Sequence, residues 1–185
     1  MRVIAGTARS LRLKTPDGMD TRPTTDRIKE TLFNMLQPYL GGALFVDLFS
    51  GSGGIGIEAL SRGARHAYFV ENEKRALSCI QENLQFTHLA EQATVLTTDV
   101  ITAVYGIHEK EADIIFMDPP YGEGYEKKVL AVLADKAYVT DDTWIIAEAE
   151  LLEDFSFSAS FGFEVIREKT YKTNKHVFLK RRQHS

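Results

Sequence analysis

The sequence predicts an α/β protein whose β-sheet is mostly parallel and is covered by helices on both faces. From residue 43 onward, apolar runs alternate with segments whose apolar residues recur at helical spacing, a pattern typical of β–α–β units. Such continuous apolar runs are expected for strands that are buried on both sides. The end of the chain differs, because two strand-like runs, 163–171 and 176–180, are joined by the short polar segment 172–175. This arrangement predicts a hairpin and therefore one antiparallel strand.

The first forty residues form an extension ahead of this alternating pattern. Residues 2–15 carry basic side chains and no acid, and their loose alternation between turn residues predicts a β-hairpin or an extended arm. From Ile28 onward, apolar residues recur at helical spacing, which predicts a helix that ends near Pro38. We therefore expect an N-terminal extension of residues 1–40 and a main domain of residues 41–185.

The remaining elements are predicted in chain order from apolar runs and helical spacing. The strands are 43–48, 66–71, 93–98, 112–117 and 143–149, the helices are 54–62, 73–87 and 124–137, and two shorter helical segments are expected near 100–110 and 150–156. A helix between two strands lets both strands run in the same direction. The five strands are therefore expected to be parallel to one another.

The composition is that of an ordinary globular protein and excludes several classes. The 185 residues are 44% hydrophobic and 26% charged, and no apolar run approaches the length of a membrane span. The single cysteine, Cys79, excludes an internal disulfide and a cysteine metal cluster, and the five histidines lack metal-ligand spacing. The N-terminus lacks the apolar core of a signal peptide. We therefore expect a cytoplasmic protein with no metal and no membrane partner.

The charge is divided unevenly between the ends and the middle of the chain. The net charge is −4, but residues 1–30 carry +3, residues 165–185 carry +6 and residues 31–164 carry −13. Basic segments on either side of an acidic body indicate a polyanionic partner such as nucleic acid. Solvated basic tails would give the same distribution, so charge alone leaves both interpretations open.

Asp118, Pro119, Pro120 and Tyr121 follow directly after the predicted strand 112–117. The prolines stiffen the backbone, so that the Asp118 carboxylate and the Pro119 carbonyl can be aimed at an exocyclic amino group. The ring of Tyr121 offers a face on which a base can stack. A strand that merely ends in a Pro–Pro turn is the simpler interpretation. The glycine-rich turn upstream, at the spacing of a cofactor site, favours the functional one.

That glycine-rich turn follows the first predicted strand. Residues 51–56 match the pattern Gly-x-Gly-x-x-Gly between a strand and a helix, and Glu71 follows Gly51 by 20 residues at the end of the next strand. The glycines let the backbone approach a ligand, and the acid can bind ribose hydroxyls. This pattern fits NAD as well as S-adenosylmethionine.

Two further acids favour the methyl donor over NAD. Asp47 precedes the turn, where a carboxylate would repel a pyrophosphate but could hold the ammonium of a methionine. Asp99 ends the third strand, where it can accept from an adenine amino group. Three acids along one edge suit a cationic ligand, so we expect S-adenosylmethionine. The expected cofactor-binding residues are Asp47, Ser50, Gly51, Gly53, Gly56, Glu71, Asp99, Val100 and Asp118.

These residues resemble the class I methyltransferases, in which Asp-Pro-Pro-aromatic is the signature of enzymes that methylate exocyclic or amide nitrogens. The segments 2–6, 22–24, 27–34 and 47–56 are similar to the bacterial 16S ribosomal RNA guanine-N2-methyltransferase family (RsmD-type), so the likeness covers essentially the whole chain. It implies a Rossmann-like sheet of order 3-2-1-4-5-7-6, with strand 7 antiparallel. It also implies methyl transfer from S-adenosylmethionine to the N2 amino group of a guanine, with assembled 30S particles as the partner.

The resemblance gives catalytic roles to Asp118, Pro119 and Tyr121, which would orient the guanine amine and stack on the flipped base. The basic ends are the expected RNA surface, because the body of the protein is acidic and the pI is only about 5.8. The expected RNA contacts are Arg9, Arg12 and Lys14 of the arm, Arg22 of the loop before the first helix, and Tyr121. The extension 1–40 would then bind RNA, and the domain 41–185 would bind the methyl donor.

Four other functions share parts of this pattern. An adenine-N6 methyltransferase of DNA or RNA would use the same Asp-Pro-Pro-Tyr chemistry, but segment 22–24 and the lack of a DNA-recognition domain disfavour it. A protein-glutamine methyltransferase is expected to have Asn in place of Asp118. A NAD-dependent oxidoreductase is disfavoured by Asp47 and by the lack of a proton relay. A non-catalytic RNA-binding module is disfavoured by the intact segment 118–121.

Overall fold

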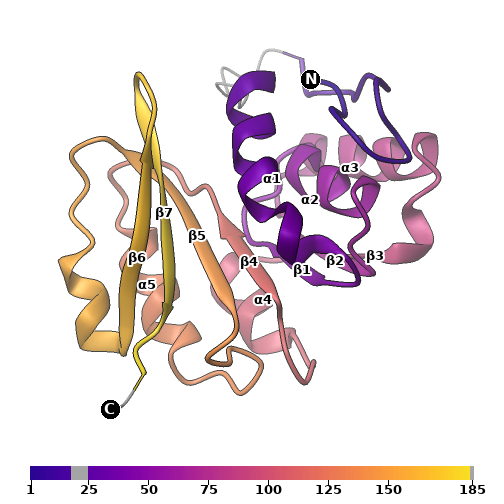
Figure 1. The fold of residues 1–185 in the computed structure, drawn as a ribbon. Helices are drawn as coiled ribbons and strands as arrows, with labels where there is room; N and C mark the ends of the chain where they lie inside the picture. Colours follow the sequence, from indigo (N-terminus) through magenta and orange to yellow (C-terminus); the bar gives the residue numbers. More distant parts are fainter. Residues whose placement is uncertain (18–24, 184–185) are drawn as a thin grey trace.

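The computed structural model describes residues 1–17 and 25–183, and a seven-stranded sheet forms its centre (Figure 1). The strands are β1 (Leu44–Asp47), β2 (His66–Val70), β3 (Ala93–Leu96), β4 (Ile114–Met117), β5 (Trp144–Glu150), β6 (Phe163–Thr170) and β7 (Asn174–Arg181). Their order in the sheet is β3-β2-β1-β4-β5-β7-β6. The pairs among β1 to β5 are parallel, whereas β7 is antiparallel to β5 and β6. The predicted strand order and the antiparallel strand are confirmed.

Helices cover both faces of this sheet (Figure 1). They are α1 (Asp26–Leu40), α2 (Gly54–Ser61), α3 (Lys74–Phe86), α4 (Val100–Gly106) and α5 (Tyr125–Leu133), with the short 3-10 helices η1 (Ala90–Gln92) and η2 (Ser156–Phe161). Neighbouring residues of β1 point to opposite faces, so that Phe45 packs with α1, α2 and α3 while Val46 packs with α4 and α5. In the part of the chain that the structure describes, none of the helices is both long enough and apolar enough to cross a bilayer.

The helix predicted to end near Pro38 is longer than the sequence indicates. It begins after Thr25, whose hydroxyl accepts the N–H of Ile28 (3.2 Å), and it runs through Pro38 to Leu40. Leu36 and Leu40 lie about one turn apart, and both are buried in the core. Their packing keeps the last turn helical despite the proline.

The prediction of a helical segment near 150–156 is wrong. Glu150 still belongs to β5, where it pairs with Asn174 of β7. The helix begins only at Ser156, because the backbone N–H and the hydroxyl of Ser156 both donate to the Asp154 carboxylate (2.9 and 2.7 Å). This local cap starts a 3-10 helix six residues after β5 has ended at Glu150.

The N-terminal arm is a narrow two-stranded ribbon, which is the predicted hairpin in its smallest form. Arg2 and Arg12 form an antiparallel bridge, and the N–H of Val3 donates to the carbonyl of Leu11 (2.9 Å). The arm buries three apolar side chains in the same core as α1, α2 and α3, namely Val3, Ala8 and Leu13. The extension therefore shares a core with the rest of the chain.

The arm runs along α2 from the first turn of this helix to its last. At the start, Met1 packs against Gly54. At the end, the N–H of Ala8 donates to the Ser61 hydroxyl (2.9 Å). Gly6 has a φ of +85°, and a Cβ atom there would overlap the Ser61 carbonyl. Only glycine permits this backbone at this distance, so the tip of the arm is fixed to the C-terminal end of α2.

A buried ion cluster on α2 joins the arm to α1. The Glu58 carboxylate accepts the backbone N–H groups of Ile4 (2.9 Å) and Ala5 (3.2 Å) and the Nε of Arg62 (2.9 Å). The ammonium of Lys29 on α1 lies 3.7 Å from the same carboxylate, and both side chains are fully buried. Burial lowers the pKa of Lys29, and the attraction of Glu58 is the main opposing effect. One carboxylate therefore holds three separate segments together.

Gly56 sets how closely α2 packs on the sheet. A Cβ atom at this position would overlap the ring of Phe69 in β2. The third glycine of such turns serves close packing between helix and strand. Gly56 therefore has a packing role in this fold, and its expected contact with a cofactor stays a prediction.

Replacing Glu58 tests the buried cluster. Glu58→Gln keeps the size of the side chain but leaves the Lys29 ammonium buried without a counter-charge, so the free energy of unfolding should fall by about 3–5 kcal/mol. The exposed pair of Lys14 and Glu82 (2.8 Å) gives the control, because Glu82→Gln should cost far less. Denaturant unfolding of the two variants measures the difference. If both variants lost the same free energy of unfolding, the buried cluster would contribute no more to stability than an exposed ion pair.

Gly56→Ala should destabilise the protein, because the added methyl group strikes the Phe69 ring. Overpacking of this kind costs about 1–3 kcal/mol. Adding Phe69→Leu should recover part of the loss, since the shorter side chain gives the methyl group room. Thermal unfolding of both single variants and the double variant checks this. Simple additivity of the two losses would show that the two positions do not interact.

Candidate active site

Four acidic side chains lie at the carboxyl ends of neighbouring parallel strands. Asp47 ends β1, Glu71 follows β2, Asp99 comes shortly after β3, and Asp118 follows β4. These strands are neighbours in the order β3-β2-β1-β4 and run in one direction. All four acids therefore lie along one side of the sheet, which we call the carboxyl edge. In Figure 1 the β6–β7 turn marks this edge at the top, because β7 begins there and runs antiparallel to β5.

The glycine-rich turn between β1 and α2 lies at this edge. Gly51 and Gly53 have left-handed backbone, with φ of +53° and +91°. The hydroxyl of Ser50 donates to the Asp47 carbonyl (3.0 Å), and the N–H of Ser50 donates to the Val70 carbonyl (2.9 Å). Gly53 is the N-cap of α2 and supplies no side-chain hydrogen bond to the helix. In the first turn of α2, the backbone N–H of Gly56 acts on the Asp47 carboxylate and opposes the rise in the pKa of Asp47.

Glu71 ties this turn to the end of β2. Its Oε2 accepts the N–H of Gly51 (2.9 Å), and its Oε1 accepts the N–H groups of Asn72 and Glu73 (both 2.9 Å). The carboxylate therefore lies beside the glycine turn, where a ribose ligand is expected to lie. A carboxylate has about four acceptor sites, so capacity remains for a ligand hydroxyl.

Asp47 is a buried carboxylate whose hydrogen-bonding capacity is not met. It is only 1% exposed, its Oδ1 accepts a long bond from the N–H of Phe49 (3.4 Å), and its Oδ2 has no partner among the described residues. Burial raises the pKa of Asp47 to about 7, the bond from Phe49 opposes this rise, and the nearby charge of Glu71 adds to it. Buried polar atoms are almost always satisfied. An exception at a strand end therefore indicates a place for a donor from a ligand.

Asp118 is half-buried directly after β4. Burial raises the pKa of Asp118 to about 8, and the negative charges of Glu148, Asp47 and Glu126 add to the effect in that order. Pro119 is buried, whereas the ring of Tyr121 is 43% exposed. A strongly raised pKa at a strand end is typical of functional carboxylates.

Asp99 has a structural task that its position in the sequence did not reveal. It caps α4, because its carboxylate accepts the N–H of Thr102 (2.9 Å) and the Thr102 hydroxyl (2.6 Å). These two bonds, the hydroxyl first, lower the pKa of Asp99. Val100 begins α4 and is buried in the core. The contacts of Asp99 and Val100 with a cofactor stay predictions.

Sequence reasoning missed a cluster of polar side chains on β5 and β7. Glu148 is buried, and it accepts from Asn174 Nδ2 (2.7 Å) and from His176 Nε2 (3.0 Å). His176 Nδ1 lies 3.0 Å from the Tyr171 hydroxyl. The available signal was the acid in the fifth strand, which continues the row of acids at the carboxyl edge. Among the described residues, no group of three or more His, Cys, Asp or Glu is placed to hold a metal ion.

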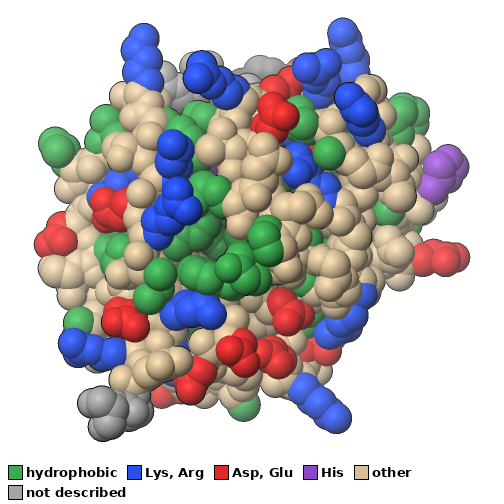
Figure 2. Space-filling view, in the orientation of Figure 1, with side chains coloured by type: hydrophobic (Ala, Val, Ile, Leu, Met, Phe, Trp, Pro, Cys, Tyr) green, Lys and Arg blue, Asp and Glu red, His purple; other side chains and the backbone are tan. Residues whose placement is uncertain are grey.

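Two of the predicted RNA-binding residues, Arg12 and Lys14, belong to a part of the arm whose backbone lies close to the glycine turn. The N–H of Lys14 donates to Asn83 Oδ1 (2.7 Å), and Asn83 Nδ2 donates to the carbonyl of Ser52 (3.0 Å) within that turn. Arg12 is exposed nearby, on the strand that pairs with Arg2. Figure 2 shows Lys and Arg side chains along the upper rim of the molecule, above the β6–β7 turn and around the N-terminal arm.

The other predicted basic contacts have different positions. Arg9 follows the turn that is fixed to Ser61, at the end of α2 far from Gly54, and its expected contact with RNA stays a prediction. Arg22 lies outside the described residues. Arg181 ends β7 at the opposite edge, where its guanidinium donates to the carbonyls of Val139 (2.6 Å) and Ala134 (2.9 Å).

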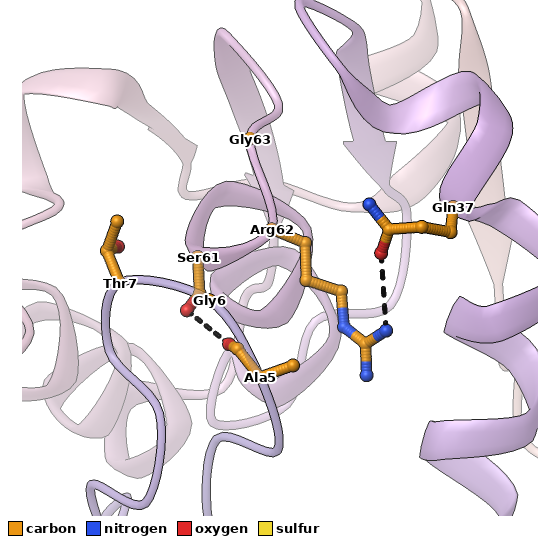
Figure 3. Close-up of a pocket in the computed structure, with 7 residues that line it drawn as sticks. All are labelled: Ala5, Gly6, Thr7, Gln37, Ser61, Arg62 and Gly63. Carbon is orange, nitrogen blue, oxygen red and sulfur yellow. Dashed lines mark hydrogen bonds between the residues drawn. The ribbon is translucent and has the colours of Figure 1, made fainter.

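One hollow among the described residues lies away from the carboxyl edge. It has a volume of about 550 Å³ and lies at the C-terminal end of α2 (Figure 3). Its lining residues are Ala5, Gly6, Thr7, Gln37, Ser61, Arg62 and Gly63. The Arg62 guanidinium in it is already bound to Glu58. The acids of the four strand ends, with their raised pKa values at Asp47 and Asp118, therefore define the candidate site better than this hollow does.

Known proteins resemble this chain over most of its length. Residues 1–180 match the family model described as conserved hypothetical protein 95. Ribosomal RNA small subunit methyltransferase D of Escherichia coli (strain K12) is 35% identical over 151 residues, which cover 82% of this chain and 75% of the relative. The protein of the same name from Haemophilus influenzae is 32% identical over 172 residues, covering 92% and 88%.

Solved structures share the architecture. The E. coli protein yhhF superposes with a TM-score of 0.83 at 30% identity, over 100% of this chain and 99% of that one. The strand order and this match show the Rossmann-like class I methyltransferase fold. Since the family model spans nearly the whole sequence, the chain belongs to the conserved hypothetical protein 95 family, which confirms the resemblance to the RsmD-type methyltransferases.

Proposed function

We propose that this protein transfers a methyl group from S-adenosylmethionine to the exocyclic N2 amino group of a guanine in small-subunit ribosomal RNA. The observation that carries the proposal is the pair of carboxylates, Asp47 and Asp118, at adjacent strand ends. Both have raised pKa values because of burial, and the charges that act on Asp118 are all negative. A ligand that brings positive charge would relieve this arrangement.

The residues at the carboxyl edge fit the methyl donor. The unpartnered Oδ2 of Asp47 would accept from the donor's ammonium group. Glu71, beside the glycine turn, would accept from the ribose hydroxyls, and Asp99 would accept from the adenine amine. When bound, the donor supplies an activated methyl group on a positively charged sulfur. A pyrophosphate ligand such as NAD would instead bring more negative charge to the same edge, which disfavours it.

The segment 118–121 would receive the base. The amine of guanine is a weak nucleophile because its lone pair is delocalised into the ring. The Asp118 carboxylate and the Pro119 carbonyl would accept its two N–H bonds and fix the nitrogen in line with the methyl group. The half-exposed ring of Tyr121 would stack on the flipped base. In this mechanism the rate acceleration comes from positioning of the guanine amine and from electrostatic stabilisation.

The choice of RNA rests on the family and on the charges at the rim. Relatives that this chain resembles over most of their length are named for methylation of small-subunit rRNA. Arg12 and Lys14 lie on the arm beside the glycine turn, which would guide a phosphate backbone toward the site. An assembled 30S particle would present a flipped guanine together with ordered phosphates, so we propose the particle as the substrate.

The direct test is mass spectrometry of ribosomal RNA. Small-subunit particles from a strain that lacks this protein should miss one N2-methylguanine, and the purified protein with S-adenosylmethionine should restore it. Recovery of N6-methyladenine instead would assign the adenine alternative. Failure to restore any methyl group would contradict the proposed function.

Affinity for S-adenosylmethionine should depend on pH near neutrality. The pKa of Asp47 is about 7 in the free protein because of burial, and only the ionised form attracts the ammonium. Affinity should therefore increase as the pH rises from about 6 to about 7.5, and it should fall again above about 8 as the ammonium itself loses its proton. Calorimetry in buffers across this range measures it, and Asp47→Asn should remove the lower limb. A wild-type affinity that is flat across the range would contradict the assignment.

Asp118→Ala should abolish methyl transfer while donor affinity stays nearly unchanged, because the lost contact is to the base. Asp118→Asn should keep a small part of the rate, since the amide oxygen can still accept one N–H bond. Single-turnover assays on small-subunit particles, combined with donor calorimetry, separate the two effects. Methyl transfer by Asp118→Ala at the wild-type rate would remove Asp118 from the chemistry.

RNA binding should depend on the side of the arm that faces the glycine turn. Each phosphate contact contributes about 0.7–0.9 to the slope of log affinity against log salt, so Arg12→Ala with Lys14→Ala should lower the slope by roughly one to two units. Arg9→Ala is the matched control, because Arg9 is exposed on the same arm but lies at the far end of α2. Binding to small-subunit particles over a range of salt gives the slopes. Equal slopes for wild type and double variant would exclude this part of the arm from the interface.

A further inference from the structure

A chain of hydrogen bonds on β5 and β7 lies outside the roles that the proposed function gives to the site residues. It contains Glu148 on β5, Asn174 and His176 on β7, and Tyr171 in the turn between β6 and β7. Glu148, Asn174 and His176 are each less than a tenth exposed. Four polar side chains gathered in a buried place are costly unless each is paired. Their arrangement therefore needs a reason beyond the closure of the sheet.

Glu148 lies beside Asp118 across two neighbouring strands. The register of β4 and β5 pairs Phe116 with Ile146 and Met117 with Ala147, so Asp118 and Glu148 follow at the next matched position. Phe116 and Ile146 belong to the same hydrophobic cluster, which places the two acids on that face of the sheet by alternation. Among the charged groups that act on Asp118, Glu148 has the largest effect.

The surrounding donors point toward Glu148. A carboxylate can only accept, so Nε2 of His176 donates to it at 3.0 Å and Nδ2 of Asn174 donates to it at 2.7 Å. His176 Nδ1 lies 3.0 Å from the Tyr171 hydroxyl, so Tyr171 holds the other side of the same ring. The ring of His176 also packs edge-on against Phe116. The position of the Glu148 carboxylate is thus fixed from two sides.

We propose that Glu148, held by Asn174 and by the Tyr171–His176 pair, is a positioning residue that keeps a negative charge beside Asp118 and thereby makes Asp118 the base that takes the proton from the methylated amine. This inference rests on the proposed function and extends it to the fate of the proton. A general base works best when its pKa lies near the working pH. Without the neighbouring charge, Asp118 would be a weaker base.

Methyl transfer to the guanine N2 is followed by proton transfer to Asp118. The N2 lone pair of guanine forms the new bond to the methyl carbon, and the bond from that carbon to sulfur breaks, with its electron pair remaining on sulfur. The nitrogen then carries a positive charge and loses one proton to the Asp118 carboxylate. The protonated Asp118 later gives this proton to solvent, after which the site is restored.

The other charges around the two groups are known, so the effect of Glu148 can be isolated. Asp118 is affected by Asp47 from β1 and by Glu126 from α5 as well as by Glu148. His176 pairs in register with Glu148 on β5 and with Lys169 on β6. Removing the charge of Glu148 alone leaves the others in place, and it should lower the pKa of Asp118.

The first experiment titrates Asp118 directly, in the full chain without RNA or donor. Carbon-detected NMR of labelled aspartate follows the carboxyl group, and Asp118→Asn identifies its signal. Glu148→Gln keeps the size of the side chain and should lower the titration midpoint of Asp118 by about one pH unit or more. Glu164→Gln is the matched control, because it removes the same charge at the far end of the hairpin, where Glu164 pairs with Lys180. That variant should leave the midpoint where it is in the wild type.

The second experiment measures single-turnover methyl transfer to small-subunit particles against pH. The acidic limb of the Glu148→Gln profile should move to lower pH, in the same direction as the titration, and the plateau rate should fall. Tyr171→Phe keeps the ring but removes the hydroxyl donor, and it should give a smaller shift in the same direction. A role confined to folding would instead lower the unfolding temperature and leave the pH profile in place.

The outcomes separate the two levels of the proposal. If the wild type methylates no RNA, the proposed function fails, while the titration still decides whether Glu148 controls Asp118. If the wild type is active and the Asp118 midpoint is the same in Glu148→Gln, the inference about Glu148 is overturned. If Glu148→Gln shifts the midpoint but Tyr171→Phe does not, Tyr171 is removed from the positioning set.

Discussion

Burial of carboxylates is the constraint on which this structure depends, and the protein meets it in two different ways. Glu58 is surrounded by Lys29, Arg62 and two backbone N–H groups, all of which belong to the protein. Asp47 is equally buried, yet one of its oxygens has no partner among the described residues. A buried charge that is fully paired holds a fold together, and one that lacks a partner costs stability until a ligand arrives. The contrast separates a structural acid from one that is kept for binding.

Helix α2 connects these two uses of a carboxylate. The first turn of the helix begins at the glycine turn beside Asp47, its middle carries Glu58, and its last residue, Ser61, fixes the tip of the arm. The arm therefore lies against the same helix that begins at the glycine turn, where we propose that the methyl donor binds. Met1 and Gly54 are in contact. If RNA binding moved the arm, the movement would therefore change the packing at the start of α2.

The sequence was sufficient for the parts of the fold that depend on local pattern. Apolar runs followed by acids located Asp47, Glu71, Asp99 and Asp118 at strand ends, because the end of a buried strand is where polarity returns. It was insufficient where a residue acts through distant partners. The Glu148 carboxylate is held in place by hydrogen bonds from Asn174 and His176. These residues are 26 and 28 positions further along the chain, and they come close to Glu148 only through the register of β5 and β7.

The same limit applies to other residues whose position depends on contacts between elements. Lys29 and Glu58 each look like an ordinary helical charge, and no local pattern reveals that both are buried. Pro38 is a reliable helix breaker in isolation, but burial of Leu40 outweighs it. The Arg9 position depends on how the arm folds back on α2, and only the contact with Ser61 fixes that. Local propensity predicts elements, whereas contacts between elements decide where particular side chains lie.

The place of β7 between β5 and β6 has a consequence for the synthesis of the protein. The penultimate position in the sheet is filled by β7, which comes last in sequence among the seven described strands, so β5 keeps an unpaired edge until residues 174–181 have left the ribosome. Arg181, at the very end of β7, then binds carbonyls of the segment 134–139 and closes that side. Folding of the sheet can therefore finish only after β7 has been synthesised and has paired with β5. Until then, each new copy exposes a bare strand edge, a hazard for pairing with other chains.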